Sequence, residues 1–514
     1  MTDIHKTDGS FDCDHISTAN GIPDRSKFDT EHTIRYIWKH LGLPESSLRF
    51  ALPDKSAALP SSFKIGHLAQ ASIALSALAA ASVDALHNNA LARKVTVPLR
   101  HAGVEFDSEK HYFLDGRPAE SGWGPLGGLH QTADGYIRMH DSFPNHRKAA
   151  CDLLGLNEQT ATREDVAEKL KHWRALEIED AAMKNNAVIY ALRSYQEWDR
   201  LPQAKSVPSF PIFVRKISDE GPKGLPSHMP KAADRCLRGL RVIDFTRVIA
   251  GPVAGKTLAA HGADVIWVTS PNLLSQPALD IDVQRGKRTI RLDLKKAEDL
   301  ETLRGLAKNA DVFLQSYRPG SFAAKELGPE DLAKLRPGII YASLNAWGNE
   351  GPWAHNRGFD SIVQTVSGMN VSEAEHFGTS PAKAMPAQAL DHAAGYLLAT
   401  GISAALYKRA TEGGSWEVTV SLAGVMKYLR SLGQHPGRSG FECAGLAEGE
   451  LESFLEERET GFGTLRAVSH SAQVEGKEPG WDVMPKPLGS DEARWSRDVG
   501  SQIHAAHLYR RTSH

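Results

Sequence analysis

The stretch Leu240-Arg241-Val242-Ile243-Asp244-Phe245 is rich in residues that favour β-structure, and it predicts a buried strand. A turn follows, Ala250-Gly251-Pro252-Val253-Ala254-Gly255-Lys256-Thr257, and then a short helical pattern over 258–261 that Gly262 ends. A second strand is expected over 263–268. Strand, glycine-bearing turn, helix and strand form a βαβ unit, whose turn directs backbone N–H groups and a helix N-terminus at a place suited to a phosphate.

The same turn allows a second interpretation. Residues 250–257 resemble a relaxed Walker A loop, because they end in Gly255-Lys256-Thr257. Ala250 stands where that motif begins with glycine, and Pro252 removes one N–H that a phosphate nest would use. A P-loop nucleotide-binding protein is therefore one alternative, and a plain tight turn before a helix is the simplest interpretation.

Downstream of this unit the chain alternates between strand and helix patterns. Strands are expected at 241–246, 263–268, 288–294, 311–316, 339–344 and 416–422, and helices at 297–309, 329–335 and from about 389 to 409. Repeated β-α-β spacing predicts an α/β fold with a doubly wound parallel sheet.

Upstream of the unit the predicted helices and strands no longer alternate regularly. Helices are expected at 31–41 and 65–86, and mixed helix and strand patterns over 100–205 predict a smaller α+β domain, with a helix over 177–192. Six prolines between 202 and 230 predict a surface connection. The expected organisation is a polar segment (1–60), a first unit (61–205), a linker (206–235), the large domain (236–430) and an irregular tail (431–514).

Composition restricts the partners. The formal net charge of 514 residues is -2, so we expect no nucleic-acid partner, and no apolar run reaches the ~20 residues of a membrane span. Four scattered cysteines and a polar N-terminus predict a cytoplasmic protein without disulfides. The 22 histidines show no metal-ligand spacing, and we expect no metal site.

The sequence also suggests an internal repeat. An Ala-rich helix and strand at 71–99 look like those at 394–422, with spacing that agrees to within about one residue. Where the second copy has Asp391, the first has Gly66-His67-Leu68 and no carboxylate. The simpler alternative is that any two helix–strand pairs rich in Ala and Val look alike.

Several short motifs together resemble the family III CoA-transferases, which include formyl-CoA and carnitine CoA-transferases and the α-methylacyl-CoA racemases. They are Asp244–Pro252, Gly262–Ile266, Gly286–Leu294, Ala310–Phe313 with Arg318-Pro319-Gly320, and Gly358-Phe359-Asp360 with Gln364 and Ser367-Gly368. The resemblance covers about 238–425, and 70–200 resembles the family's helix and small domain, as a degenerate, truncated first copy. It implies a Rossmann-like domain plus a smaller α+β domain. Family members form interlocked dimers, so we expect a monomeric pseudo-dimer or a homodimer here.

The resemblance identifies Asp391 as the catalytic nucleophile. A carboxylate can attack a thioester to give a mixed anhydride, and the CoA thiolate can return to give an aspartyl-CoA thioester. A place at a helix N-terminus is expected to keep Asp391 ionised. Cationic and backbone donors for the phosphates of coenzyme A are expected from the following residues: Arg247, Ala250, Gly251, Lys287, Arg288 and Arg318.

At two positions this chain differs from members of the family, and each difference bears on which of the family's activities is expected. The racemases have histidine where this chain has Phe359, and phenylalanine cannot exchange a proton. Formyl-CoA transferase has glutamine where this chain has Ile249, so a less polar acyl substrate is expected. The predicted function is a CoA-transferase moving coenzyme A between an acyl-CoA and a carboxylic acid. The alternatives are an acyl-CoA racemase or isomerase, a P-loop nucleotide-binding protein and a non-catalytic CoA-binding protein.

Overall fold

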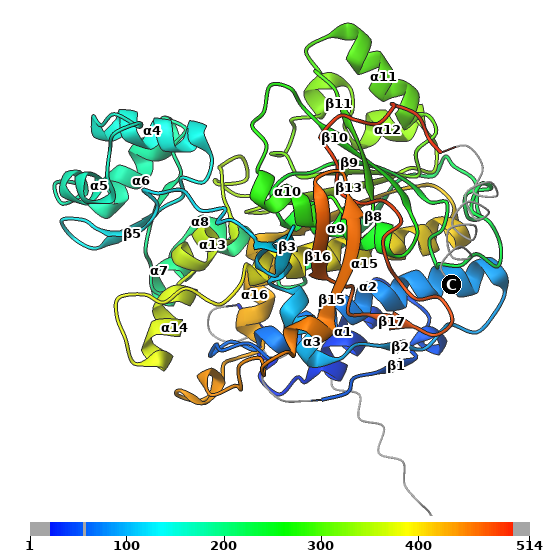
Figure 1. The fold of residues 1–514 in the computed structure, drawn as a ribbon, viewed down its shortest axis with the longest axis horizontal. Coiled ribbons are helices and arrows are strands. Elements are labelled where there is room, and N and C mark those ends of the chain that lie inside the picture. Colours follow the sequence, from blue (N-terminus) through cyan, green and yellow to red (C-terminus); the bar gives the residue numbers. More distant parts are fainter. Residues whose placement is uncertain (1–20, 55–57, 497–514) are drawn as a thin grey trace, which may run out of the picture.

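The computed structural model describes residues 21–54 and 58–496 (Figure 1). Its central feature is a seven-stranded sheet in the order β11-β10-β9-β12-β13-β14-β8. The strands are β8 (Ile212–Ser218), β9 (Arg241–Phe245), β10 (Asp264–Thr269), β11 (Lys287–Arg291), β12 (Val312–Gln315), β13 (Ile340–Asn345) and β14 (Ser415–Ser421). All neighbouring pairs are parallel except β14 and β8. The six parallel strands have the Rossmann order 3-2-1-4-5-6, which confirms the predicted fold class.

Helices cover both faces of this sheet, so the side chains of each strand alternate between two cores. Val242 of β9 belongs to the core that contains α9 (Ala250–Ala260) and α15 (Ala389–Glu412). The next residue, Ile243, belongs to a second core with α11 (Ala297–Ala307) and α12 (Pro329–Leu335). Such two-sided burial explains why the parallel strands are apolar almost throughout.

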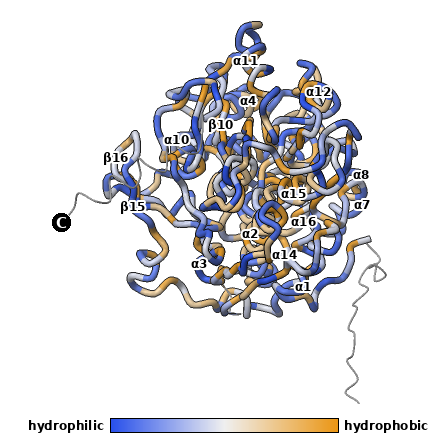
Figure 2. Tube along the Cα trace, turned by 90° about the vertical axis from the view of Figure 1, so that its right-hand side faces the viewer, coloured by the Kyte–Doolittle hydropathy of each residue, from blue (hydrophilic) through white to orange (hydrophobic). Residues whose placement is uncertain are grey.

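Helix α2 (Ile65–Asn88) packs along α15, and each helix is 24 residues long. Figure 2 shows the hydrophobic segments gathered around these two helices. By length and composition α2 could cross a membrane, contrary to the expectation that no segment is apolar enough, but its apolar window is completely buried inside the protein. α2 is therefore accounted for as a core helix, as its small side chains suggested.

The front of the chain forms the expected smaller α+β domain. It contains β5 (Gly128–Gln131), β6 (Tyr136–Met139), β7 (Ile189–Ala191), α4 (Pro144–Leu154), α5 (Arg163–Leu170) and α6 (Ala175–Lys184), with a core of its own. The helix predicted over 177–192 is wrong in its second half. Asn186 takes a left-handed conformation (φ 61°) just after α6 ends, and the apolar residues that follow form β7.

Two further expectations need correction. The segment 206–235 is more than a linker, because its proline-free run forms β8 at the edge of the central sheet. The described part of the predicted tail, 431–496, is not irregular throughout: β15 (Leu455–Thr460) and β16 (Gly463–Val468) form a hairpin, and β16 pairs with β3 (Tyr112–Leu114). Alternating burial along β16 marks it as a strand, and its partner comes from the front of the chain.

Candidate active site

Asp391 is the third residue of α15, and a second carboxylate caps the start of that helix. Oδ2 of Asp360 accepts the amide hydrogens of Leu390 (2.7 Å) and Asp391 (3.1 Å). Asp360 begins α13 (Asp360–Val366), and Gln364 of the same helix donates to its other oxygen. The Gly358-Phe359-Asp360 motif therefore positions the backbone of Asp391, while leaving the Asp391 carboxylate available.

Asp391 lines a cavity of about 570 Å³ at the carboxyl ends of the parallel strands. The loops after β9, β12 and β13 form its walls, and β9 and β12 are the neighbours at which the strand order reverses. Open α/β sheets bind ligands at this switch point. Of the six residues predicted to bind coenzyme A, four line the cavity: Arg247, Ala250, Gly251 and Arg318.

The front half of the chain completes the cavity. Phe143, Asn145 and His146, at the start of α4, line it opposite the loops of the large domain. Phe359 packs between the two parts, since its ring is stacked on that of His140 at 3.8 Å and lies edge-on to His146 at 5.8 Å. One chain therefore supplies both walls of this cavity.

Three arginines give the cavity a strong positive charge. Within residues 21–54 and 58–496, Arg247, Arg318 and Arg357 form no ion pair with a carboxylate. Burial and these three guanidinium groups lower the pKa of His146 to about 4. Unpaired arginines in one cavity are suited to an anionic ligand such as a phosphate or carboxylate. Arg357 was not predicted, although its place directly before Gly358 was a usable signal.

Two predicted CoA-binding residues do not reach this cavity. Lys287 is fully buried, and its Nζ donates to Oδ2 of Asp244 and to the carbonyl of Pro252, both at 2.8 Å. Arg288 pairs with Asp264 at 2.7 Å on another part of the sheet. Neither residue lines the cavity, and their contact with coenzyme A stays a prediction. Both cations at the start of β11 are paired with carboxylates, and Lys287 also binds the first turn of α9 through the carbonyl of Pro252.

The P-loop interpretation is also wrong. Gly255, Lys256 and Thr257 lie inside α9, which begins already at Ala250. Nζ of Lys256 is buried against Asp282 at 2.8 Å, and Oγ1 of Thr257 donates to the carbonyl of Val253. Neither side chain is available to a nucleotide. The helix start still leaves the amides of Ala250 and Gly251 without intrahelical acceptors, beside the cavity.

The charge state of Asp391 differs from the expectation. Only 7% of the residue is exposed, and burial, Asp360 and Glu109 raise the pKa of Asp391 well above its ordinary value. The helix N-terminus favours the ionised form, but removal from water and two neighbouring carboxylates outweigh it. The carboxyl group is therefore held in its neutral form over a wider pH range than a surface aspartate.

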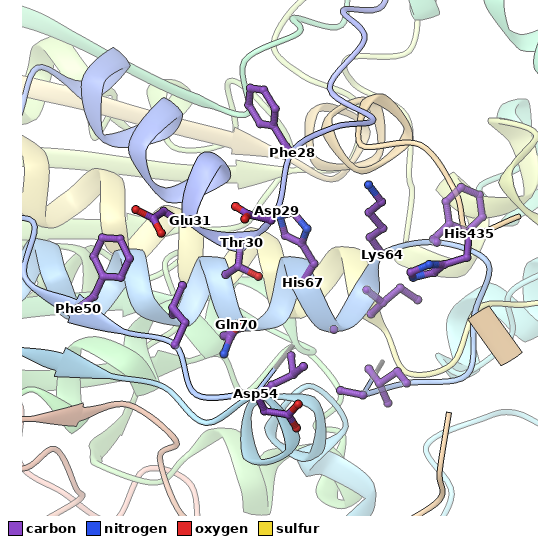
Figure 3. Close-up of a pocket in the computed structure, with 17 residues that line it drawn as sticks. Phe28, Asp29, Thr30, Glu31, Phe50, Asp54, Lys64, His67, Gln70 and His435 are labelled. Atoms are coloured by element: carbon purple, nitrogen blue, oxygen red, sulfur yellow. The ribbon is translucent and has the colours of Figure 1, made fainter. Parts of the chain in front are cut away.

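A second cavity, of about 400 Å³, lies at the start of α2 (Figure 3). Its wall includes His67, which is the third residue of α2, as Asp391 is of α15. Nε2 of His67 is 2.8 Å from Oγ1 of Thr33, and burial lowers the pKa of His67 to about 3. Among the described residues that line this cavity there is no arginine. The Asp391 cavity is therefore the candidate active site. No group of three or more potential metal ligands occurs among the described residues.

Part of the chain is similar to a known family. Residues 237–435 match CoA-transferase family III. The match covers less than half of the chain and shows what this part is similar to. The interpretation of 61–205 as a truncated first copy lies outside the matched range and stays a prediction.

Three relatives of this chain carry different names. An acyl-CoA transferase of Gibberella moniliformis is 31% identical over 57% of this chain and 54% of its own length. A probable fatty acyl-CoA transferase of Mycobacterium tuberculosis is 35% identical over 38% of this chain and 52% of its own. An alpha-methylacyl-CoA racemase of Mus musculus is 32% identical over 38% and 50%. The chain spans about half the length of each of these relatives.

Proposed function

We propose that this protein transfers coenzyme A between an acyl-CoA donor and a carboxylic acid acceptor through Asp391. The observation that carries the proposal is the cavity itself, in which one carboxylate faces three arginines that lack ion-pair partners among the described residues. A nucleophile and an anion site in the same cavity suit a substrate that joins a thioester to phosphates. The relatives include a racemase as well as transferases, so similarity alone does not separate the two activities.

The reaction needs four balanced steps. The Asp391 carboxylate attacks the thioester carbonyl, and the CoA thiolate leaves, which gives an acyl-aspartyl anhydride. The thiolate then attacks the aspartyl carbonyl, which releases the donor acid and gives an aspartyl-CoA thioester. The acceptor carboxylate attacks that thioester to give a second anhydride, and the thiolate attacks its acyl carbonyl to release the new acyl-CoA and free Asp391.

The surrounding residues have separate roles in this scheme. Arg247, Arg318, Arg357 and the amides at the start of α9, which all line the cavity, bind the phosphates and neutralise the charge of the substrate. Asp360 holds the start of α15 and so the direction of the Asp391 side chain. Because burial and neighbouring carboxylates raise the pKa of Asp391, transfer is expected to increase with pH as this group loses its proton.

An acyl-CoA racemase or isomerase is the second candidate, and one unpaired nitrogen atom in the cavity favours it. Nδ1 of His146 has no hydrogen-bond partner within the described part of the chain, and His146 lines the same cavity as Asp391. This imidazole could take the place of the histidine that Phe359 replaces. Deuterium incorporation at the α-carbon of a 2-methylacyl-CoA in D₂O would reveal such proton exchange, and transfer without exchange would exclude it.

Trapping of the acyl-enzyme tests the transferase directly. The protein is incubated with acyl-CoA and then with hydroxylamine or borohydride, and mass spectrometry locates the modified residue. We expect modification of Asp391 and its absence in Asp391→Asn, with CoA still bound by the variant. Bound CoA without any modification of Asp391 in the unaltered protein would refute the proposal. Size-exclusion chromatography with light scattering distinguishes a monomeric pseudo-dimer from a homodimer.

A further inference from the structure

The front half of the chain places a buried glutamate beside the helix that carries Asp391. Glu109 lies in the short 3-10 helix η3 (Ser108–Lys110), and its side chain is 6% exposed. Its Oε2 is 2.9 Å from Nε2 of His392, whose side chain is 1% exposed. His392 directly follows Asp391, so residues nearly 300 positions apart form a buried pair at the candidate nucleophile.

Several contacts fix Glu109 in this place. The ring of His392 is stacked on Phe106 at 5.5 Å, so the histidine side chain is held from the front half as well. Ser108 donates to Oδ2 of Asp282 at 2.8 Å, and Asp282 is paired with Lys256 of α9. Because η3 is tied to both α9 and α10 (Pro277–Val283), the Glu109 carboxylate cannot move away from α15 without breaking a buried network.

We propose that Glu109 is a positioning residue which, with His392, sets the pH at which Asp391 becomes a nucleophile. The proposal rests on the transferase function proposed above. Glu109 takes no part in bond formation; its charge acts on Asp391 from the side of the front half. The two halves of the chain are thereby coupled in activity as well as in structure.

The charges around Asp391 show why Glu109 matters. Asp360 of α13 and Glu109 of η3 both act on the charge of Asp391, and His392, the partner of Glu109, is its neighbour on α15. The cavity wall carries Arg247, Arg318, Arg357 and His146. Burial raises the pKa of Asp391 most, followed by Asp360 and then Glu109. Burial opposes the charge of Glu109 itself, but His392 and Lys110 keep the pKa of Glu109 below its ordinary value, with Asp107 as a further nearby acid.

Glu109 is also the neighbouring carboxylate whose charge can be removed without removing the cap of α15. Asp360 caps α15, so its removal would disturb the start of the helix together with the electrostatics. Glu109→Gln keeps the shape of the side chain and removes its charge. We expect the acidic limb of the kcat/KM profile to move to lower pH by about half a unit or more, since a nearby like charge raises a carboxyl pKa. Glu109→Asp retains the charge and is expected to keep the limb close to that of the unaltered protein.

A readout that does not depend on turnover completes the test. Carbodiimides modify protonated carboxyl groups, so mass spectrometry of the Asp391 peptide against pH reports its protonation directly. Glu109→Gln is expected to shift this labelling curve in the same direction. If Glu109→Gln does not fold, Glu109→Met provides a second neutral replacement. Whichever neutral variant folds has to show the same shift of the labelling curve.

The outcomes separate this inference from the transferase proposal. Labelling of Asp391 that shifts in a protein without any transfer would refute the transferase and support the role of Glu109. Transfer that falls equally at every pH in Glu109→Gln, with an unmoved acidic limb and labelling curve, would show that Glu109 only packs, and would overturn the inference.

Discussion

Lys287 was expected to bind coenzyme A, whereas its contacts indicate that it holds the phosphate-facing turn from inside the protein. In Lys287→Met the ammonium group is lost while a side chain of similar length remains. Two hydrogen bonds of 2.8 Å disappear, one to Asp244 and one to the carbonyl of Pro252. Asp244, which is completely buried, then retains Thr246 as its side-chain donor and no counter-charge among the described residues.

The size of the effect follows from this burial. Removing one partner of a fully buried ion pair costs about 3–5 kcal/mol, because the remaining charge is left unpaired away from water. In a protein of this size each kcal/mol lowers the melting temperature by roughly 2–4 °C, so the expected decrease is on the order of 10 °C. Lys287→Met/Asp244→Leu removes both charges and is expected to recover most of the loss.

Thermal unfolding and calorimetric CoA binding at low temperature together test this reasoning. We expect Lys287→Met to melt much earlier than the unaltered protein, while its folded fraction binds CoA with an affinity changed less than about threefold. The double variant serves as the control for the ion pair. An unchanged melting temperature with CoA affinity reduced tenfold or more would mean that Lys287 contacts the ligand, and the structural interpretation would be wrong.

Three further predictions concern the cavity and its supporting helices. Arg318→Gln is expected to raise the KM for acyl-CoA about tenfold without changing the melting temperature, while Arg288→Gln, outside the cavity, leaves KM unchanged in the same steady-state assay. The raised pKa of Asp391 means that folding favours its neutral form; this stabilisation is complete below the unfolded pKa and is lost as pH rises through the folded pKa. Asp391→Asn should therefore melt higher than the unaltered protein at pH 8, and equal melting temperatures at pH 8 would contradict this sign. Gly395→Ala places a Cβ 2.6 Å from the carbonyl of Ala250 and should destabilise the α9–α15 contact by about 1–3 kcal/mol in urea unfolding, whereas Gly305→Ala, which meets open space, should not.

Local patterns were sufficient where neighbours in sequence decide the structure. The strands of the parallel sheet, the capping box at Thr162 and Asp165, and the buried helix α2 follow from apolar runs and cap residues over a few turns. Two elements were missed. β8 was taken for a linker because its partner β14 lies far away in the chain. β15 and β16 were taken for an irregular tail although they form a local hairpin, and only the pairing of β16 with β3 is long-range.

By itself, the sequence determined the doubly wound fold and the strand–helix–strand unit at its centre, although α9 begins at Ala250, earlier than predicted, and its resemblance to a known family gave Asp391 as the nucleophile to test. The fold depends on the periodicity of apolar residues, which is local. Only the tertiary structure decided which cations line the cavity: Lys287 is buried against Asp244, and Arg357 joins Arg247 and Arg318 in the cavity wall. It also reversed the expected effect on the pKa of Asp391, because desolvation and the charges of Asp360 and Glu109 depend on what packs against a residue, and no local pattern records that.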